Sequence, residues 1–289
     1  MPVRRWMRND GIKWLCAAGV LIYLASILLM PYSQIAIYSV WEKEMYAFRP
    51  AFVLDNYARA FSNELYRRVI LNSAIVATSV TLVTAILGYA LAWYLAMYAN
   101  RWRILLLFLL IVPLWTSFLL RAYTWKIILG RNGILNSFMM DVGLIGEPLP
   151  HLLYSKFSIS LALIYIFLPF VALPVYAALE KMPRGYLEAS ADLGASASAT
   201  FRHVALPLSM PALTAGATIV FCLSFGDFIT PVLLGGTGDL MISNVIISQF
   251  GAAFDWPFGS ALAILVLLVV LGLVALLRAL GQWSARGAA

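Results

Sequence analysis

Hydrophobic residues in this chain gather into long runs that are separated by shorter polar stretches. Six of these runs are close to or above the length of about twenty residues that a helix needs to cross the hydrocarbon layer of a bilayer. A segment inside that layer must satisfy its backbone hydrogen bonds internally, so each run is expected to be a helix. The predicted membrane-spanning helices cover residues 14–37, 69–98, 104–120, 158–179, 208–225 and 259–280.

The distribution of Lys and Arg predicts which way this bundle faces. Six spans put both termini on one side, together with residues 99–103 and 180–206. This side has 11 basic residues in 57 positions, whereas the other side has nine in 100. Because short loops rich in Lys and Arg stay in the cytoplasm, the N- and C-termini are predicted to be cytoplasmic.

The first run follows Arg4, Arg5, Arg8 and Lys13, and a basic start of this kind is also typical of a cleaved signal peptide. No small-x-small cleavage site closes the run. An even number of spans also requires it, so a retained membrane anchor is the favoured interpretation.

Two loops on the outer side have a helical pattern of their own. In the first, Asp55 suits an N-cap, and the apolar residues Tyr57, Phe61 and Leu65 recur at the spacing of one helix face. In the second, residues 130–144 begin with turn-forming residues and continue with a half-apolar stretch. Both are predicted to be short amphipathic helices that pack on the bundle.

Composition indicates a membrane protein. Of the 289 residues, 63% are hydrophobic and only 11% are charged, and the mean hydropathy is +0.89. Soluble proteins are about a quarter charged, so this chain has too little polar surface to cover a soluble core. The net charge of +7 could indicate nucleic-acid binding, but the basic residues are scattered among the spans, so no nucleic-acid partner is expected. The predicted fold is an all-α membrane protein in which residues 1–289 form one domain in contact with lipid.

Residue types that carry catalysis or bind metals are not grouped in the sequence. Cys16 and Cys222 lie in apolar runs without metal-site or disulfide spacing, and we interpret them as core residues. The two histidines, His151 and His203, are predicted on opposite sides of the membrane. None of the five lysines follows a glycine, so the sequence lacks a phosphate-binding Gly-Lys loop. The chain is therefore expected to be a non-catalytic subunit without a metal site.

Charged residues near the spans are candidates for function, because a charge at the centre of a bilayer costs at least about 2.5 kcal/mol. Arg121 and Trp115 lie at the end of the third run, and Asp227 lies beside Phe228 after the fifth. A carboxylate next to an aromatic ring suits an ammonium group. These four residues are candidates for a substrate pathway. Two alternatives remain open: Arg121 extends to the outer headgroups, and Asp227 caps or ends a helix.

Residues 180–207 form the longest predicted cytoplasmic loop, which we call the coupling loop. After Pro183, the stretch YLEASADL can form about two helical turns, roughly 12 Å long, before Gly194 ends them. Small residues at 189–191 make one side of this helix thin, so it can enter a groove on a partner. A second helical stretch then leads into the fifth span at Pro207.

The coupling loop resembles a motif of the inner-membrane subunits of binding-protein-dependent ABC importers, E-A-A-x3-G-x9-I-x-L-P. The matching positions are Glu188, Ala189, Ser190, Gly194, Val204, Leu206 and Pro207. Ser190 and Val204 depart from the motif, which has Ala and Ile there. The resemblance implies the type I importer fold with six core helices. It also implies that this loop docks on an ATPase subunit, with Asp192 and the other named residues at the contact.

Further stretches resemble the spermidine/putrescine subgroup of these permeases, including FVLDNY, GRNGILN and SFGDFITPVLLGG. The resemblance implies a bacterial inner-membrane protein that moves a small cationic solute from the periplasm to the cytoplasm. The implied partners are two ATPase copies that use ATP and Mg, a second permease subunit and a periplasmic binding protein. No cofactor is expected in this chain.

Three alternatives are kept. Relatives that carry opines or other amino compounds share much of the pattern, so a solute of that class remains open. An ion-gradient-driven secondary transporter would show buried ionisable residues at midplane and inverted repeats, which the sequence does not display. A membrane-bound enzyme would need a group of catalytic residues.

Overall fold

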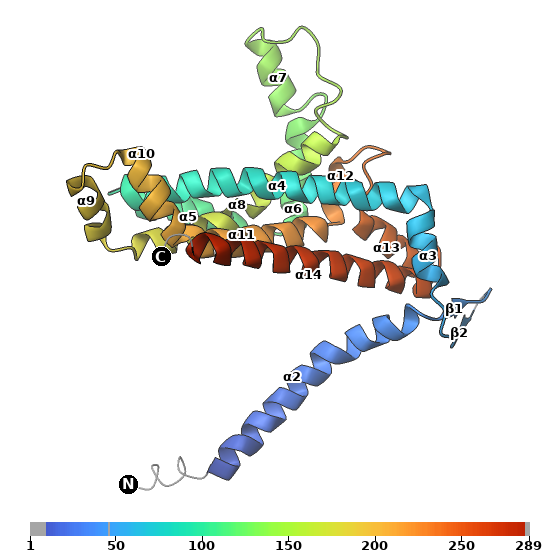
Figure 1. The fold of residues 1–289 in the computed structure, drawn as a ribbon. Coiled ribbons are helices and arrows are strands. Elements are labelled where there is room, and N and C mark those ends of the chain that lie inside the picture. The colour runs from blue at the N-terminus through green and yellow to red at the C-terminus, as the bar shows by residue number, and fades with distance from the viewer. Residues whose placement is uncertain (1–9, 46, 287–289) are drawn as a thin grey trace. The chain divides into compact units, whose positions relative to one another are not determined.

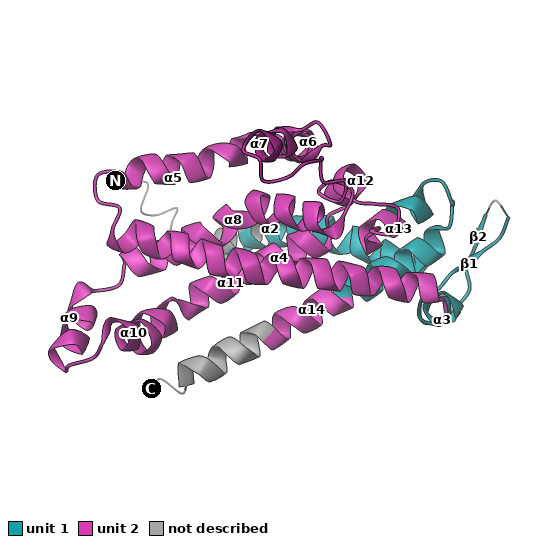
Figure 2. Ribbon diagram, turned by 90° about the horizontal axis from the view of Figure 1, so that it is seen from above, with its two compact units in different colours: residues 1–62, 246–267 teal, residues 63–245, 268–289 magenta. Residues whose placement is uncertain are grey.

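The computed structural model describes residues 10–45 and 47–286, and their backbone is mostly helical. The predictions that concern Arg4, Arg5, Arg8 and the last three residues lie outside this range, as does the side chain of Cys16. The described chain divides into two compact units, of residues 1–62 with 246–267 and of residues 63–245 with 268–289, coloured separately in Figure 2. The prediction of a single domain stays a prediction.

The first unit contains a long apolar helix and a small aromatic cluster. Its elements are α2 (Asp10–Tyr38), β1 (Glu42–Lys43), β2 (Phe48–Arg49), α3 (Asp55–Ser62), the end of α13 (Ile242–Phe250) and the start of α14 (Trp256–Arg286). Phe48 stacks on Phe254 and Trp256, with ring centroids 5.3 and 5.8 Å apart. Arg59 of α3 forms an ion pair with Asp255 at 2.8 Å, so the predicted amphipathic helix at Asp55 is present and packs against residues before α14.

The second unit is built on three long helices that lie side by side in Figures 1 and 2. These are α4 (Glu64–Met97), α8 (Lys156–Glu180) and α11 (Leu206–Phe225), and each packs against the other two. Glycines allow the close approach, because a Cβ at Gly88 would lie 2.9 Å from Val171 and one at Gly216 would lie 2.8 Å from the carbonyl oxygen of Phe170.

Shorter elements of the second unit connect and flank these helices. They are α5 (Arg103–Ile111), η1 (Val112–Trp115), α6 (Phe118–Leu129), α7 (Ile134–Asp141), α9 (Arg184–Asp192), α10 (Ala197–Thr200), η2 (Phe201–Ala205) and α12 (Ile229–Leu234). The second predicted amphipathic helix, within residues 130–144, is therefore α7. Ser155 and Ser158 form a reciprocal capping box at the start of α8, which fixes where that span begins.

Five of the predicted spans fall within helices that are long and apolar enough to cross a membrane: Ala17–Tyr38, Glu64–Met97, Lys156–Glu180, Ala197–Phe225 and Trp256–Leu276. The prediction of one continuous helix over residues 104–120 is wrong. The chain bends by 102° between Arg103–Trp115 and Phe118–Asp141. Pro113 lacks a backbone donor, and Thr116 and Ser117 have extended backbone angles, so the α-helical hydrogen bonding stops there.

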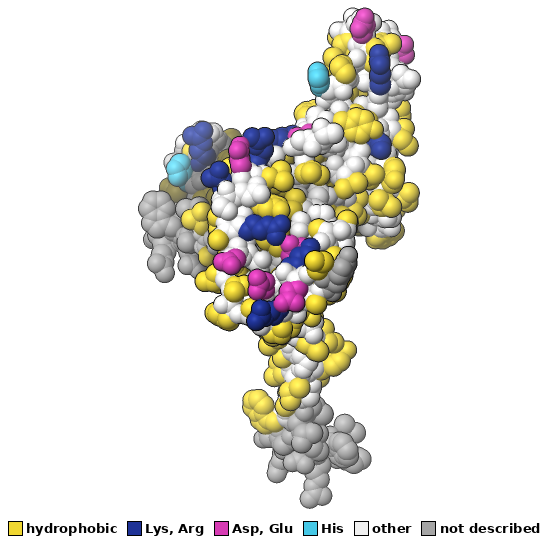
Figure 3. Space-filling view, turned by 90° about the vertical axis from the view of Figure 1, so that its right-hand side faces the viewer, with side chains coloured by type: hydrophobic (Ala, Val, Ile, Leu, Met, Phe, Trp, Pro, Cys, Tyr) yellow, Lys and Arg dark blue, Asp and Glu magenta, His cyan; other side chains and the backbone are white. Residues whose placement is uncertain are grey.

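The surface agrees with a membrane environment. On the face shown in Figure 3, hydrophobic side chains lie open to the outside, and charged side chains of both signs are interspersed among them. In the described part of α2 from Ala17 to Tyr38, no residue of the most apolar stretch is buried within the chain. Apolar side chains on all sides of a helix are typical of one surrounded by lipid or by other helices.

Candidate functional site

The first half of the coupling loop forms the helix that the sequence predicts. Helix α9 starts after Pro183, and its last turn is closed by hydrogen bonds from the Leu193 N–H to the Ala189 oxygen and from the Ala195 N–H to the Ser190 oxygen, both 3.1 Å. Gly194 follows with φ of +81°, a conformation that glycine adopts without strain. The prediction that Gly194 ends this helix is confirmed.

Helix α9 presents the residues of the motif to the outside. Glu188, Ala189 and Asp192 are exposed, and Ser190 is half-buried. Ala189 adds little bulk beside the Glu188 carboxylate, so this face is thin and carries negative charge. Such a face can enter a groove and reach basic or polar groups there.

The second half of the loop leads back to the membrane-spanning helices. Ser196 caps α10 by accepting a hydrogen bond from the Ala199 N–H at 3.3 Å. The π-helical turn η2 then connects α10 to α11, where Leu206 is half-buried and Pro207 occupies the first turn. Because η2 runs directly into α11, Pro207 lies in a continuous helical stretch and supplies no backbone N–H there.

Ser190, which replaces the Ala of the motif, joins the two halves of the loop. Its hydroxyl oxygen lies 2.9 Å from that of Thr200, so α9 and α10 are linked by a hydrogen bond between side chains. The sequence gave no sign of this link, because the two residues are ten positions apart and belong to different helices.

An ion pair that the sequence did not reveal lies at the base of the loop. Arg103, at the start of α5, donates a hydrogen bond to Glu180 at the end of α8. The Arg103 guanidinium also lies 5.6 Å from the centre of the Tyr176 ring. The pair therefore connects α5 to the helix that enters the coupling loop.

Asp227 is 7% exposed and lies between α11 and α12. Its carboxylate oxygens accept hydrogen bonds from the N–H groups of Ile229 at 3.2 Å and Thr230 at 3.1 Å, so it caps α12. The structure therefore shows the capping role that the sequence analysis kept as an alternative for Asp227. Phe228 is 43% exposed, so its ring does not share the burial of the neighbouring carboxylate.

Two buried residues with hydroxyl groups, Ser224 and Thr230, lie close to Asp227 in the sequence. Both are fully buried; among the described residues the Ser224 hydroxyl has no hydrogen-bond partner, whereas the Thr230 side chain interacts with the Asp227 carboxylate. A buried hydroxyl without a partner is unfavourable, and such groups occur where a ligand or water completes them. The Ser224 hydroxyl, three positions before Asp227, therefore has hydrogen-bonding capacity that the fold does not use.

Arg121 of α6 faces a pocket of about 440 Å³ rather than pointing only to the outside. One guanidinium nitrogen lies 3.5 Å from the carbonyl oxygen of Ile166, and the group lies 5.7 Å from the Phe118 ring centre. The described residues that line the pocket are Val112, Pro113, Thr116, Leu120, Arg121, Thr124, Trp125, Ile128 and Tyr165.

Of the four candidates for the substrate pathway, Arg121 alone is among the described residues that line this pocket. Trp115 is 78% exposed and contacts Phe108, with ring centroids 6.4 Å apart. Neither Trp115, Asp227 nor Phe228 lines the pocket of Arg121. Within the described residues, no three His, Cys, Asp or Glu side chains come together as a metal-binding group.

Residues 58–286 match the family of binding-protein-dependent transport system inner membrane components. The match runs from α3 to the end of α14 and takes in the whole coupling loop. The chain belongs to this family. The predicted family and the predicted type I importer fold are therefore confirmed, and the protein is a permease subunit of the ABC importer class.

Among the relatives of this permease is the spermidine/putrescine transport system permease protein PotB of Escherichia coli strain K12, 43% identical over 225 residues, which are 78% of this chain and 81% of the relative. PotB of Haemophilus influenzae is 36% identical over 259 residues, 89% of each chain. The inner membrane ABC transporter permease protein YdcU of Escherichia coli is 36% identical over 249 residues, 82% of this chain and 78% of the relative.

The permease fold also resembles a solved structure. A chain of a bacterial ABC transporter for the import of alginate superposes with a TM-score of 0.76 over 98% of this chain and 99% of that one. The two sequences are only 16% identical, so the similarity concerns the fold.

Proposed function

We propose that this permease moves a polyamine of the spermidine or putrescine class from the periplasm to the cytoplasm, as one membrane-spanning subunit of an ATP-driven importer. The observation that carries the proposal is the 43% identity to the spermidine/putrescine permease of Escherichia coli, which extends over 78% of this chain. Identity of this level over most of a permease supports a shared solute class.

The coupling loop is the proposed contact with the ATPase. Two ATPase copies bind ATP and Mg, a second permease subunit completes the pathway, and a periplasmic binding protein delivers the solute. The exposed face with Glu188 and Ala189 supports this docking. ATP binding then shifts the outward-open and inward-open populations, because the ATPase contacts α9 differently in the two states. In this arrangement the N- and C-termini face the cytoplasm of a bacterial inner membrane.

Asp227 is the proposed partner of a substrate ammonium group. Its carboxylate is a buried negative charge, and the buried hydroxyl of Ser224, three positions earlier, has no hydrogen-bond partner among the described residues. Because the site is 7% exposed, it has to open before a solute can reach it. Arg121 and a polyamine have the same sign of charge, so Arg121 lines the pathway in this proposal without binding an ammonium group.

Reconstitution tests this proposal. The permease, purified with its partner subunits and binding protein, is placed in proteoliposomes with ATP inside. Uptake of labelled spermidine, putrescine and an amino compound that carries a carboxylate is then measured. ATP-dependent uptake of a polyamine is expected. Uptake of the carboxylate compound alone would replace the polyamine with the opine class. Uptake that needs an ion gradient and no ATP would contradict the importer.

A further inference from the structure

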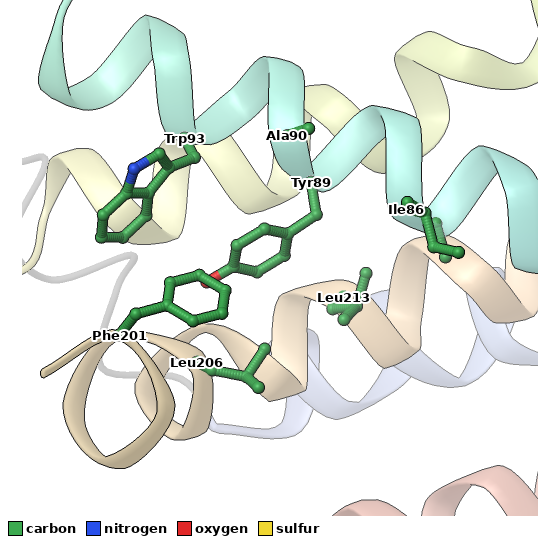
Figure 4. A pocket seen from close by; sticks show the side chains of 8 residues that line it. Ile86, Tyr89, Ala90, Trp93, Phe201, Leu206 and Leu213 are labelled. Atoms are coloured by element: carbon green, nitrogen blue, oxygen red, sulfur yellow. The ribbon is translucent and has the colours of Figure 1, made fainter. Parts of the chain in front are cut away.

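One aromatic ring of the coupling loop packs against the membrane-spanning helix α4. Phe201, the first residue of η2, contacts two aromatic residues of α4 (Figure 4). Its ring centroid lies 5.6 Å from that of Tyr89 and 5.3 Å from that of Trp93, and both pairs are edge-to-face at 89° and 88°. This is a favoured geometry for aromatic pairs.

Tyr89 is itself held in place. Its hydroxyl lies 2.9 Å from the Ser209 hydroxyl, which donates to the Ala205 carbonyl oxygen at 2.7 Å. The Tyr89 O–H therefore donates to Ser209, and both residues are buried. Through this bond α4 is connected to the first turns of α11, and Phe201 packs against a ring that cannot turn away easily.

The backbone at Phe201 is also unusual. Residues Phe201–Ala205 form a π-helical turn between α10 and α11. Wide turns of this kind inside helices are frequently found at functional sites. Here the turn lies where the coupling loop joins the membrane-spanning helix α11, so its backbone is at the position where a movement of α10 would reach that helix.

Space is available beside the ring. A pocket of about 460 Å³ lies between α4 and α11, with Phe201, Tyr89, Trp93, Ile86 and Leu213 among its walls (Figure 4). Its lining is almost entirely apolar, so water is not favoured there. Because no side chain fills this side, the contact of Phe201 with α4 depends on the two ring pairs with Tyr89 and Trp93.

Helix α9 is connected to the bundle along this route. Helix α9 packs on α10 and η2, and the Ser190–Thr200 hydrogen bond strengthens that contact. We propose that Phe201 is a positioning residue for transport: its ring holds α10 and η2 against Tyr89 and Trp93, so that displacement of α9 by the ATPase moves α4 together with α11. This inference rests on the proposed importer function.

A double-mutant cycle in the reconstituted complex tests the role. The variants are Phe201→Leu, Trp93→Leu and both together, and the measurement is solute imported per ATP hydrolysed. Each single variant is expected to lower this ratio by roughly fivefold or more, the usual range of coupling between sites. The double variant should lose no more than Phe201→Leu alone, because Phe201→Leu already removes the contact with Trp93. Phe201→Tyr, which keeps the ring, should retain the ratio.

Phe221→Leu is the matched control. It removes the same atoms from a buried position on α11, where Phe221 stacks on Phe225 with centroids 5.5 Å apart. Its ratio should equal that of the unchanged protein, with the same amount of ATPase in the complex. Unchanged ratios in both single variants would overturn the inference, and so would an equal loss in Phe221→Leu or additive losses in the double variant.

A second measurement separates this inference from the proposed solute. Spin labels are placed at exposed Ser198 on α10 and Tyr98 after α4, in a chain whose two native cysteines are replaced by serine. The distance between the labels should stay the same with and without ATP, because Phe201 holds α10 to α4. In Phe201→Leu it should change on ATP binding. If the complex imports no polyamine but shows this difference, the proposed solute is wrong and the role of Phe201 stands. Equal behaviour of both chains overturns that role.

Discussion

At the scale of single residues, Asp227 combines a structural role with spare capacity for a ligand. A carboxylate has about four acceptor positions, and the N–H groups of Ile229 and Thr230 use two of them. The carboxylate is 7% exposed, and the buried Ser224 hydroxyl, three positions earlier, has no partner among the described residues. Sequence reasoning located this residue and also raised its capping role. It could not show that Asp227 both caps α12 and is available to a ligand, because its burial and its contacts with backbone N–H groups depend on the fold around α12.

The variant Asp227→Asn tests the ligand role. It keeps the shape but removes the charge, and hydrogen bonds to charged groups contribute about 1.5–3 kcal/mol. We therefore expect the KM for polyamine uptake to rise about tenfold to 150-fold, with the same amount of ATPase in the complex. Asp239→Asn is the control, because Asp239 also accepts a backbone hydrogen bond, from Gly236 at 3.1 Å. Unchanged KM and rate in Asp227→Asn would leave Asp227 as a helix cap only.

At the scale of elements, local signals predicted α9 well and the third span poorly. Pro183 and Gly194 act on their own neighbours, so the limits of α9 follow from the sequence. The hydrophobic run between 104 and 120 shows that the segment is long and apolar enough to span a membrane, but it does not show whether the helix axis stays straight. The 102° bend at Thr116 and Ser117 therefore could not be predicted from it. Phe201 contacts Tyr89 and Trp93, which are more than 100 positions away in the sequence, so no local pattern could predict these contacts.

Replacement of Gly194 tests the end of α9. In Gly194→Ala the side chain meets no atom within 4 Å, so the effect comes from the backbone φ of +81° alone. A left-handed conformation costs a non-glycine residue about 1–2 kcal/mol, so the end of α9 should loosen. Solute import should fall several-fold while insertion into the membrane persists. Gly143→Ala is a matched control with φ of +74° and equally open surroundings in the loop after α7. Equal effects of the two variants would contradict a special role of Gly194.

At the scale of the whole molecule, the family match over residues 58–286 identifies the chain as the inner membrane component of a transport system. The sequence lacks a phosphate-binding lysine loop, yet α9 offers an exposed face whose neighbours lead to the membrane-spanning helices. Five of the six spans and the family were predictable, because they follow from the length of the hydrophobic runs and from the motif in the coupling loop. The division into two compact units was not, since it depends on which helices pack together.

Purification from the native membrane tests the docking of a second chain on α9. In mild detergent, an ATP-hydrolysing subunit should accompany the permease. Glu188→Lys should lower the amount of that subunit strongly, because it reverses the charge on the exposed face that is proposed to enter the ATPase groove. Glu147→Lys makes the same charge change at an exposed loop residue after α7 and should leave the amount unchanged. ATPase activity in the purified permease can be compared between the two variants at equal protein amounts. If both variants retain the subunit equally, α9 does not bind it through this face, and if no such subunit accompanies the unchanged protein, an ion-gradient-driven transporter becomes the better interpretation.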